Sequence, residues 1–270
     1  MILFFKIIAK GLVRFLRNKN ERRFIYLVIL YGNSKRYKEK NININSMRLL
    51  VPDALSFIWQ FKEIFADENY KFKTDSVKPV IFDCGANIGV SCLYFSKNYP
   101  GSKIIAFEAD PAIVKILRTN LETNNVNNVE VIDKAVWIND EDISLSIEGA
   151  DGATVYSNIN SIKVKSVRLK NLLENEQKID LLKMDIEGAE QDVIIDCGNS
   201  LKCVRNIFIE YHSINGVEQK LSEILNVLEE NKFRYFIKPV NDREKPFLNR
   251  SNKNNPMMDL QLNIFGYKET

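Results

Sequence analysis

The sequence predicts an α/β fold with a mostly parallel sheet and helices on both faces, and three observations support this prediction. From residue 79 onward, apolar runs alternate with amphipathic runs along the chain. A glycine-spaced turn follows the first apolar run directly, as in Rossmann-like sheets. The length of 270 residues suffices for one large core. We therefore expect a Rossmann-like catalytic domain over residues 51–270 and an N-terminal helical extension over residues 1–50.

The alternation of apolar and amphipathic runs predicts the following helices and strands, in chain order. Before the sheet, we expect a helical stretch at 21–31, a polar connector at 32–45 and a helix at 52–65. The main strands are predicted at 79–84, 103–108, 128–133, 179–184 and 205–211, and the helices between them at 89–99, 111–124, 187–196 and 217–231. Residues 143–166 are predicted to form short inserted strands, and segments 234–238 and 260–267 to form a closing antiparallel pair.

The turn after the first strand reads Asp83-Cys84-Gly85-Ala86-Asn87-Ile88-Gly89. Gly85 and Gly89 allow backbone angles and close approaches that a Cβ atom forbids. The spacing differs from the G-x-G-x-x-G turn that places backbone amides against a pyrophosphate. Asp83 would repel such a pyrophosphate, whereas an acid, the Asn87 amide and a helix start suit a ligand that carries both an ammonium and a carboxylate. S-adenosylmethionine has such a group.

Two further acids are predicted to lie at strand ends. Glu108 follows the second apolar run, where a carboxylate can accept hydrogen bonds from both hydroxyls of a ribose. Asp133 ends the third strand and is a candidate acceptor for the exocyclic amine of adenine, although a solvated loop acid explains it nearly as well. The predicted cofactor residues are Asp83, Gly85, Asn87, Gly89, Glu108 and Asp133.

The acceptor side is predicted where the fourth and fifth strands end. Asp185 and Glu187 lie at a transition from strand to helix, where acids orient a substrate, bind a metal or cap the helix. Glu190, inside the predicted helix, is assigned a structural role. His212, the only histidine, shares a strand face with Glu210 and can accept a proton from an alcohol. We expect His212, Asp185 and Glu187 to act in catalysis, with Asp185 the competing base.

A divalent cation is a further expectation at this strand edge. Its ligands would be Asp185, Glu210 and His212. The formal net charge of +3 and the absence of a long basic run count against nucleic acid as the main partner. Four cysteines without zinc-ligand spacing indicate reduced, mostly buried thiols in a cytoplasmic protein.

Residues 1–17 are apolar but carry a regular stripe of basic side chains, Lys6, Lys10, Arg14 and Arg17. The charges count against a signal peptide and against a membrane-spanning helix. Two interpretations stay open: a helix that contacts the inner membrane surface peripherally, and a helix that packs on the domain.

The chain resembles the FkbM family of S-adenosylmethionine-dependent methyltransferases over roughly residues 50–240. The resemblance depends on the segments VIFDCGANIGVS at 80–91, AFEADP at 106–111, LRTNLETN at 117–124, LLKMDIEGAE at 181–190 and IEYH at 209–212. It implies a seven-stranded Rossmann-like fold and methyl transfer to oxygen, commonly a hydroxyl of a sugar or a secondary metabolite. Ala109 departs from the family, which often has proline there.

Two alternatives to an O-methyltransferase were weighed. An NAD-dependent oxidoreductase shares the sheet and the ribose acid but normally has the tighter glycine spacing. A catalytically inactive, methyltransferase-like interaction module at a membrane surface would not need the intact set of Asp83, Asn87 and Glu108. The acceptor, a saccharide or small metabolite in our expectation, and the oligomeric state are not specified by the sequence.

Overall fold

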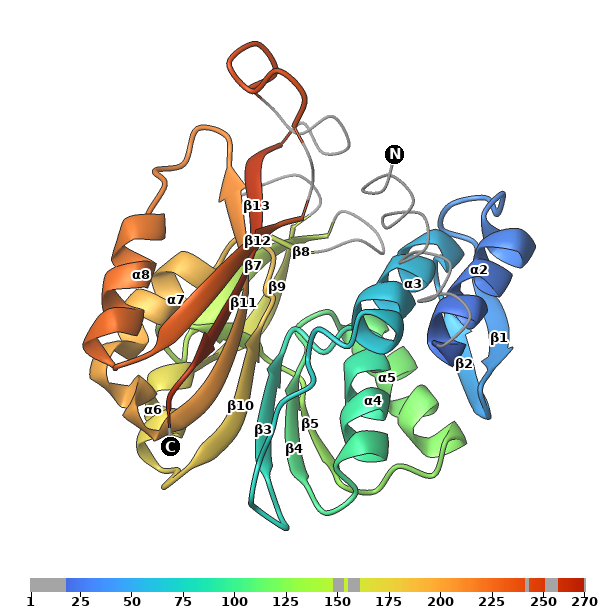
Figure 1. Cartoon of the computed structure of the whole chain (residues 1–270), viewed down its shortest axis with the longest axis horizontal. Helices are drawn as coiled ribbons and strands as arrows, with labels where there is room; N and C mark the ends of the chain where they lie inside the picture. Colours follow the sequence, from blue (N-terminus) through green and yellow to red (C-terminus); the bar gives the residue numbers. More distant parts are fainter. Residues whose placement is uncertain (1–17, 148–152, 155–160, 241–242, 251–256, 270) are drawn as a thin grey trace, which may run out of the picture.

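The computed structural model describes residues 18–147, 153–154, 161–240, 243–250 and 257–269. A seven-stranded sheet forms its centre, with the strand order β12-β13-β11-β10-β3-β4-β5 (Figure 1). The strands are β3 (Val80–Cys84), β4 (Lys103–Phe107), β5 (Val129–Ile132), β10 (Ile179–Met184), β11 (Val204–Ile214), β12 (Arg234–Pro239) and β13 (Met258–Tyr267). The predicted fold class is confirmed.

The chain connections lead outward from β3 to both sides of the sheet. Strands β11, β10, β3, β4 and β5 pair in parallel, while β13 runs antiparallel to both β11 and β12. From β3 the chain moves outward to β4 and β5, and it then returns to β10 on the other side of β3. Such a crossover leaves a crevice at the carboxyl ends of the central strands. The predicted closing antiparallel pair is confirmed, and the fourth and fifth predicted strands, β10 and β11, are neighbours.

Helices cover both faces of the sheet (Figure 1). One face carries α4 (Val90–Asn98) and α5 (Pro111–Thr123), and the other carries α6 (Leu169–Glu174), α7 (Glu190–Cys197) and α8 (Leu221–Glu230). Asp110 caps α5 by accepting from the N–H of Ala112, and Pro111 occupies the first turn, where a missing N–H costs nothing. Each face of the sheet forms a hydrophobic core with its helices.

Helix α7 begins three residues later than the sequence predicts. Glu187 has φ 55° and Gly188 has φ 103°, so neither residue continues a right-handed helix. The connection from β10 to α7 is therefore a turn that carries Asp185 and Glu187 at the strand end. Helix α6 and the 3₁₀ segment η3 (Gly198–Cys203) were not expected.

The N-terminal part contains α2 (Lys19–Tyr31), β1 (Lys40–Ile44), β2 (Met47–Val51), α3 (Ala54–Phe61) and a π-helical turn η1 (Lys62–Ala66). The prediction of a connector through residue 45 was wrong over β1, which pairs antiparallel with β2. Asn45 and Ser46 link the two strands with positive φ angles of 54° and 64°. Two such residues match the twist of a tight hairpin.

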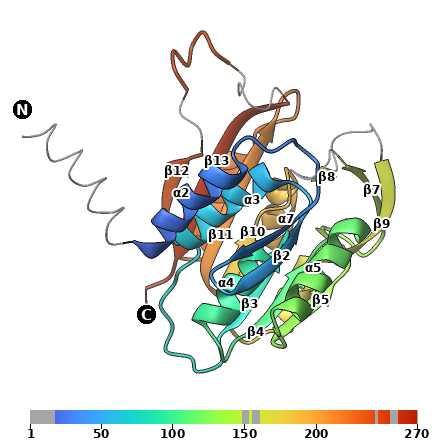
Figure 2. The ribbon, with the colours of Figure 1, turned by 90° about the vertical axis from the view of Figure 1, so that its right-hand side faces the viewer.

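The β1–β2 hairpin is attached to α5 by two amide side chains. Asn120 accepts from the N–H of Leu50 and donates to its carbonyl, and Asn124 does the same with Arg48. In a side view the hairpin lies beside α5, with α2 and α3 next to it (Figure 2). These elements share a hydrophobic core with α4, α5 and the face of the sheet that those helices cover.

The predicted inserted strands are also present. Strands β6 (Ala135–Trp137), β7 (Asp142–Ile147), β8 (Ala153–Thr154) and β9 (Ser161–Arg168) form a second sheet in the order β6-β9-β7-β8. Residues 1–17, for which a peripheral membrane contact and packing on the domain both stayed open, lie outside the described residues. Among the helices that the structure describes, none has the length and apolar character that a membrane span requires.

Candidate functional site

A cavity of about 770 Å³ opens at the carboxyl ends of β3, β4, β10 and β11. Its size is in the range of small-molecule and cofactor sites. The opposite wall is supplied by α3 and η1, and a further wall by β12 and β13. Of the predicted site residues, Gly85, Asn87, Glu108, Asp185, Glu187, Glu210 and His212 line this cavity.

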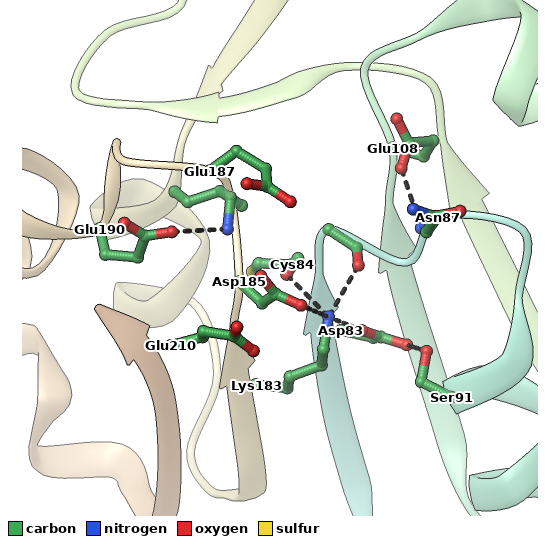
Figure 3. A network of polar contacts seen from close by, with 12 residues as sticks. Asp83, Cys84, Asn87, Ser91, Glu108, Lys183, Asp185, Glu187, Glu190 and Glu210 are labelled. Carbon is green, nitrogen blue, oxygen red and sulfur yellow. Dashed lines mark hydrogen bonds and ion pairs between the residues drawn. The ribbon is translucent and has the colours of Figure 1, made fainter. Parts of the chain in front are cut away.

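The β3 loop and the end of β4 are held together by Glu108. Its Oε2 accepts from the N–H of Asn87 at 2.9 Å (Figure 3). Its Oε1 accepts from the N–H groups of Ala109 and Asp110, each at 2.9 Å. Burial raises the pKa of Glu108, and these three hydrogen bonds oppose the rise. The carboxylate is thus fixed in place at the edge of the cavity.

The three other predicted cofactor residues do not line the cavity. Asp83 is fully buried and accepts from Ser91 Oγ at 2.5 Å, while Nζ of Lys183 lies 3.3 Å from its Oδ1. Gly89 is the N-cap residue of α4 and has a left-handed backbone conformation, φ 90°. Asp133 is exposed in the connection after β5. Direct contacts of these residues with a cofactor stay predictions.

Lys183 connects the two halves of the site. Its Nζ donates to the carbonyl oxygen of Gly85 at 2.7 Å and lies 3.4 Å from Oδ2 of Asp185. Burial alone would lower the pKa of Lys183, but the charges of Asp83 and Asp185 outweigh burial and raise it. Lys183 is not among the predicted site residues. Its apolar neighbours in the strand indicated burial, and a buried lysine requires an acidic partner.

His212 and Glu190 form a buried pair on the other side of Asp185. Nδ1 of His212 lies 3.1 Å from Oε1 of Glu190, which also accepts from the backbone N–H groups of Ile186 and Gly188. The structural role predicted for Glu190 agrees with these bonds, because they fix the turn between β10 and α7. The other ring nitrogen, Nε2, lies 3.6 Å from Glu210 and 3.8 Å from Glu187.

The charges in this part of the cavity shift several pKa values. Burial raises the pKa of Asp185 to about 6 and that of Glu187 to about 8. Burial would lower the pKa of His212, but the carboxylates of Glu190 and Glu187 hold it well above its ordinary value.

Three cavity residues were missed by sequence reasoning. Glu63 projects from the π-helical turn, where burial and the charges of Glu210 and Asp185 raise its pKa to about 8. Gln261 and Asn263 come from β13, opposite His212 and Glu210 respectively. The helical pattern around residue 63 gives no sign of a π turn, whereas the polar residues in the β13 run did offer a signal.

Comparison with known proteins assigns the family. The FkbM methyltransferase domain matches residues 83–235. Methyltransferase 1 of Beauveria bassiana is 31% identical over 49% of this chain and 64% of its own length, so the match spans less than two thirds of that relative. The hexuronic acid methyltransferase AglP of Haloferax volcanii is 25% identical over 71% of this chain and 79% of its own length. The 31-O-demethyl-FK506 methyltransferase FkbM of Streptomyces tacrolimicus is 25% identical over 64% and 80%. The chain belongs to the FkbM methyltransferase domain family.

Proposed function

We propose that the protein is an S-adenosylmethionine-dependent O-methyltransferase that acts on a hydroxyl group of a saccharide or small metabolite. One observation carries the proposal. The β3 loop with Glu108 and the acidic turn with Asp185 and Glu187 line the same cavity, on its two sides. A methyl donor and an acceptor bound at these sides would meet over the ends of β3 and β10.

The residues of the β3 side fit S-adenosylmethionine. Glu108 presents a fixed carboxylate where two ribose hydroxyls can donate to it. The first turn of α4, at Val90 and Ser91, faces the cavity and offers the positive end of a helix to a carboxylate. When bound, the cofactor supplies a methyl group already activated by its sulfonium. The protein then has to orient the acceptor oxygen, exclude water and take one proton.

The proton acceptor that the geometry favours is Glu187. It lies in the cavity with a side chain 27% exposed and in a left-handed backbone conformation, φ 55°, which non-glycine residues adopt at a cost. Strain of this kind persists where the surrounding structure enforces it, and it is common at active sites. Asp185 and His212 flank Glu187 and would orient the acceptor hydroxyl between them.

The acceptor class follows from the chemistry of this wall and from relatives. Carboxylates and an imidazole are suited to hydrogen-bond a polyhydroxylated compound. The relatives from Haloferax and Streptomyces are named for a hexuronic acid and for an O-demethyl substrate. The dehydrogenase alternative has no such support, and the family match counts against an unrelated interaction module.

The test supplies the full-length protein with S-adenosylmethionine labelled with carbon-13 in its methyl group and with a panel of hexuronic acids and hexoses. We expect a product whose labelled methyl resonance is that of an O-methyl ether. Glu187→Gln should slow transfer by about 10²- to 10⁴-fold, as typical for loss of a general base, without changing cofactor affinity. Glu141→Gln, an exposed acid, is the control. A methyl group found on nitrogen or carbon, or full activity of Glu187→Gln, would contradict the proposal.

A further inference from the structure

One wall of the cavity, here called the acceptor wall, is formed by η1, the turn after β10 and the adjoining ends of β11 and β13. It holds more carboxylates than cations. Around Lys183 and His212 lie six carboxyl groups: Glu63, Asp83, Asp185, Glu187, Glu190 and Glu210. Lys62 on the same wall pairs with Asp67 at 2.5 Å, and its charge also acts on Glu63. Buried carboxylates are costly unless a cation or hydrogen-bond donors compensate them.

The internal contacts account for only part of this cluster. Asp83 has Lys183 and Ser91 as partners, and Glu190 accepts from two backbone N–H groups and faces His212. Glu63, Asp185 and Glu210 face the open cavity, where Asp185 has Lys183 as a partner at 3.4 Å and Glu210 accepts from Nε2 of Gln261 at 2.6 Å. They come from three separate elements, η1, the β10 turn and β11, and approach the same volume.

An unsatisfied amide oxygen lies on the same wall. Asn263 is only 3% exposed, it lines the cavity, and its Oδ1 has no hydrogen-bond partner. It lies directly opposite Glu210 in the antiparallel pairing of β11 and β13, so both side chains are on one face of the sheet. A buried carbonyl oxygen normally has a partner. A hydrogen-bond donor or a cation in the cavity would supply that partner.

His212 is oriented like a metal ligand. A metal-bound histidine usually donates its second ring N–H to a carboxylate, which fixes the ring. Here Nδ1 faces Glu190, while Nε2 lies 3.2 Å from Nε2 of Gln261 and 3.6 Å from Glu210. Ligand atoms of Asp185, Glu190 and His212 all lie within 4.8 Å of one another. Because Glu190 is engaged with backbone N–H groups, we assign it to orienting His212 rather than to binding an ion.

We propose that this wall binds one divalent cation of the Mg²⁺ or Mn²⁺ class, with ligands from Asp185, Glu210, His212 and Asn263 and with Glu63 facing the ion from η1. A set dominated by oxygen ligands favours these ions, and no cysteine in the described residues lines the cavity. As a deepening of the proposed function, the ion would hold the acceptor's hydroxyl oxygen beside Glu187. Glu63 lies in η1, before residue 83, where the matched FkbM domain begins. The N-terminal part of the chain therefore adds this carboxyl group to the cavity.

The test is a titration of the full-length, metal-stripped protein with Mn²⁺, followed by electron paramagnetic resonance of the free ion. We expect one bound ion, displaced by excess Mg²⁺, and at least roughly tenfold weaker binding in Glu210→Gln and in Asp185→Asn. The control is Glu68→Gln, an exposed acid five residues after Glu63, which should bind Mn²⁺ as the unmodified chain does.

Asn263→Asp should change the Tm in opposite directions without and with metal. Without metal, this isosteric change adds a carboxylate to the cluster and should lower Tm, whereas saturating Mn²⁺ should raise Tm by more than in the unmodified chain. Mn²⁺ binding should also persist in Glu108→Ala, so a failure of the cofactor site is distinguished from a failure of the metal site. No bound Mn²⁺, or equal affinity in Glu210→Gln and Glu68→Gln, would overturn the proposal.

Discussion

Nζ of Lys183 donates to the carbonyl oxygen of Gly85 at 2.7 Å, which ties the middle of the site to the turn after β3 (Figure 3). The same ammonium lies 3.3 Å from Asp83 and 3.4 Å from Asp185. The buried ammonium of Lys183 therefore holds three groups in fixed positions: the backbone of the turn after β3, the carboxylate of Asp83 and the carboxylate of Asp185.

Replacing Lys183 with methionine should destabilise the protein strongly. The change would leave two carboxylates near a buried site without their cation, and breaking a buried pair costs about 3–5 kcal/mol. Urea unfolding followed by circular dichroism measures this loss. Lys178→Met is the matched control, since Lys178 pairs with Asp180 at 2.7 Å but is 46% exposed. That pair should cost less than about 1 kcal/mol. Equal losses in both variants would refute the central role of Lys183.

Gly85 should not tolerate a side chain. Its φ is +83°, and an added Cβ would lie 1.7 Å from the backbone oxygen of Asp185. Gly216 has nearly the same φ, +84°, but nothing lies within 4 Å of its added Cβ. Gly216→Ala should therefore cost only the left-handed penalty, about 1–2 kcal/mol. Gly85→Ala should cost that penalty and roughly 1–3 kcal/mol of overpacking in addition. Thermal unfolding of the two variants compares them, and similar Tm values would contradict the close approach of the β3 turn to β10.

Asp53 should make stability depend on acid pH. It is 1% exposed and caps α3, where it accepts from the N–H groups of Leu55 and Ser56 and from Arg36. Burial would raise the pKa of Asp53, but the hydrogen bonds from Tyr37, Ser56 and Arg36 lower it below its ordinary value. A folded pKa below the unfolded one stabilises the protein above about pH 4, and this contribution is lost as the pH falls through the folded pKa.

The Asp53→Asn variant tests this sign. Above about pH 4 it should be less stable than the unmodified chain by about 0.5–1.5 kcal/mol, because asparagine can still cap the helix but lacks the charge that Arg36 contacts. The difference should shrink as both proteins are acidified, because protonated Asp53 loses the same contacts. Urea unfolding at a series of pH values measures it. A difference that grows in acid would reverse the assignment.

The parallel sheet could be predicted because its strands are buried on both faces and therefore read as unbroken apolar runs. The β1–β2 hairpin was missed although it carries a signal. In Lys40–Ile44, Ile42 and Ile44 are buried while Asn41 and Asn43 are exposed, which is the alternation of a half-buried strand. The high asparagine content masked that alternation.

Site residues could be predicted where an acidic side chain directly follows an apolar strand, as at Glu108 and Asp185. Glu63 could not be predicted, because its direction depends on a π turn that a helical pattern does not encode. The raised pKa of His212 was equally hidden, since it depends on Glu190 and Glu187, which reach the ring only through the turn between β10 and α7.

The measurement that tests the central claim most directly is a calorimetric titration of the full-length protein with S-adenosylmethionine, compared with NAD and repeated on Glu108→Ala. The account predicts micromolar binding of S-adenosylmethionine, no binding of NAD, and roughly 10- to 100-fold weaker binding in the variant, as expected for loss of hydrogen bonds to a charged group. Preference for NAD, or affinity for S-adenosylmethionine that Glu108→Ala leaves unchanged, would contradict it.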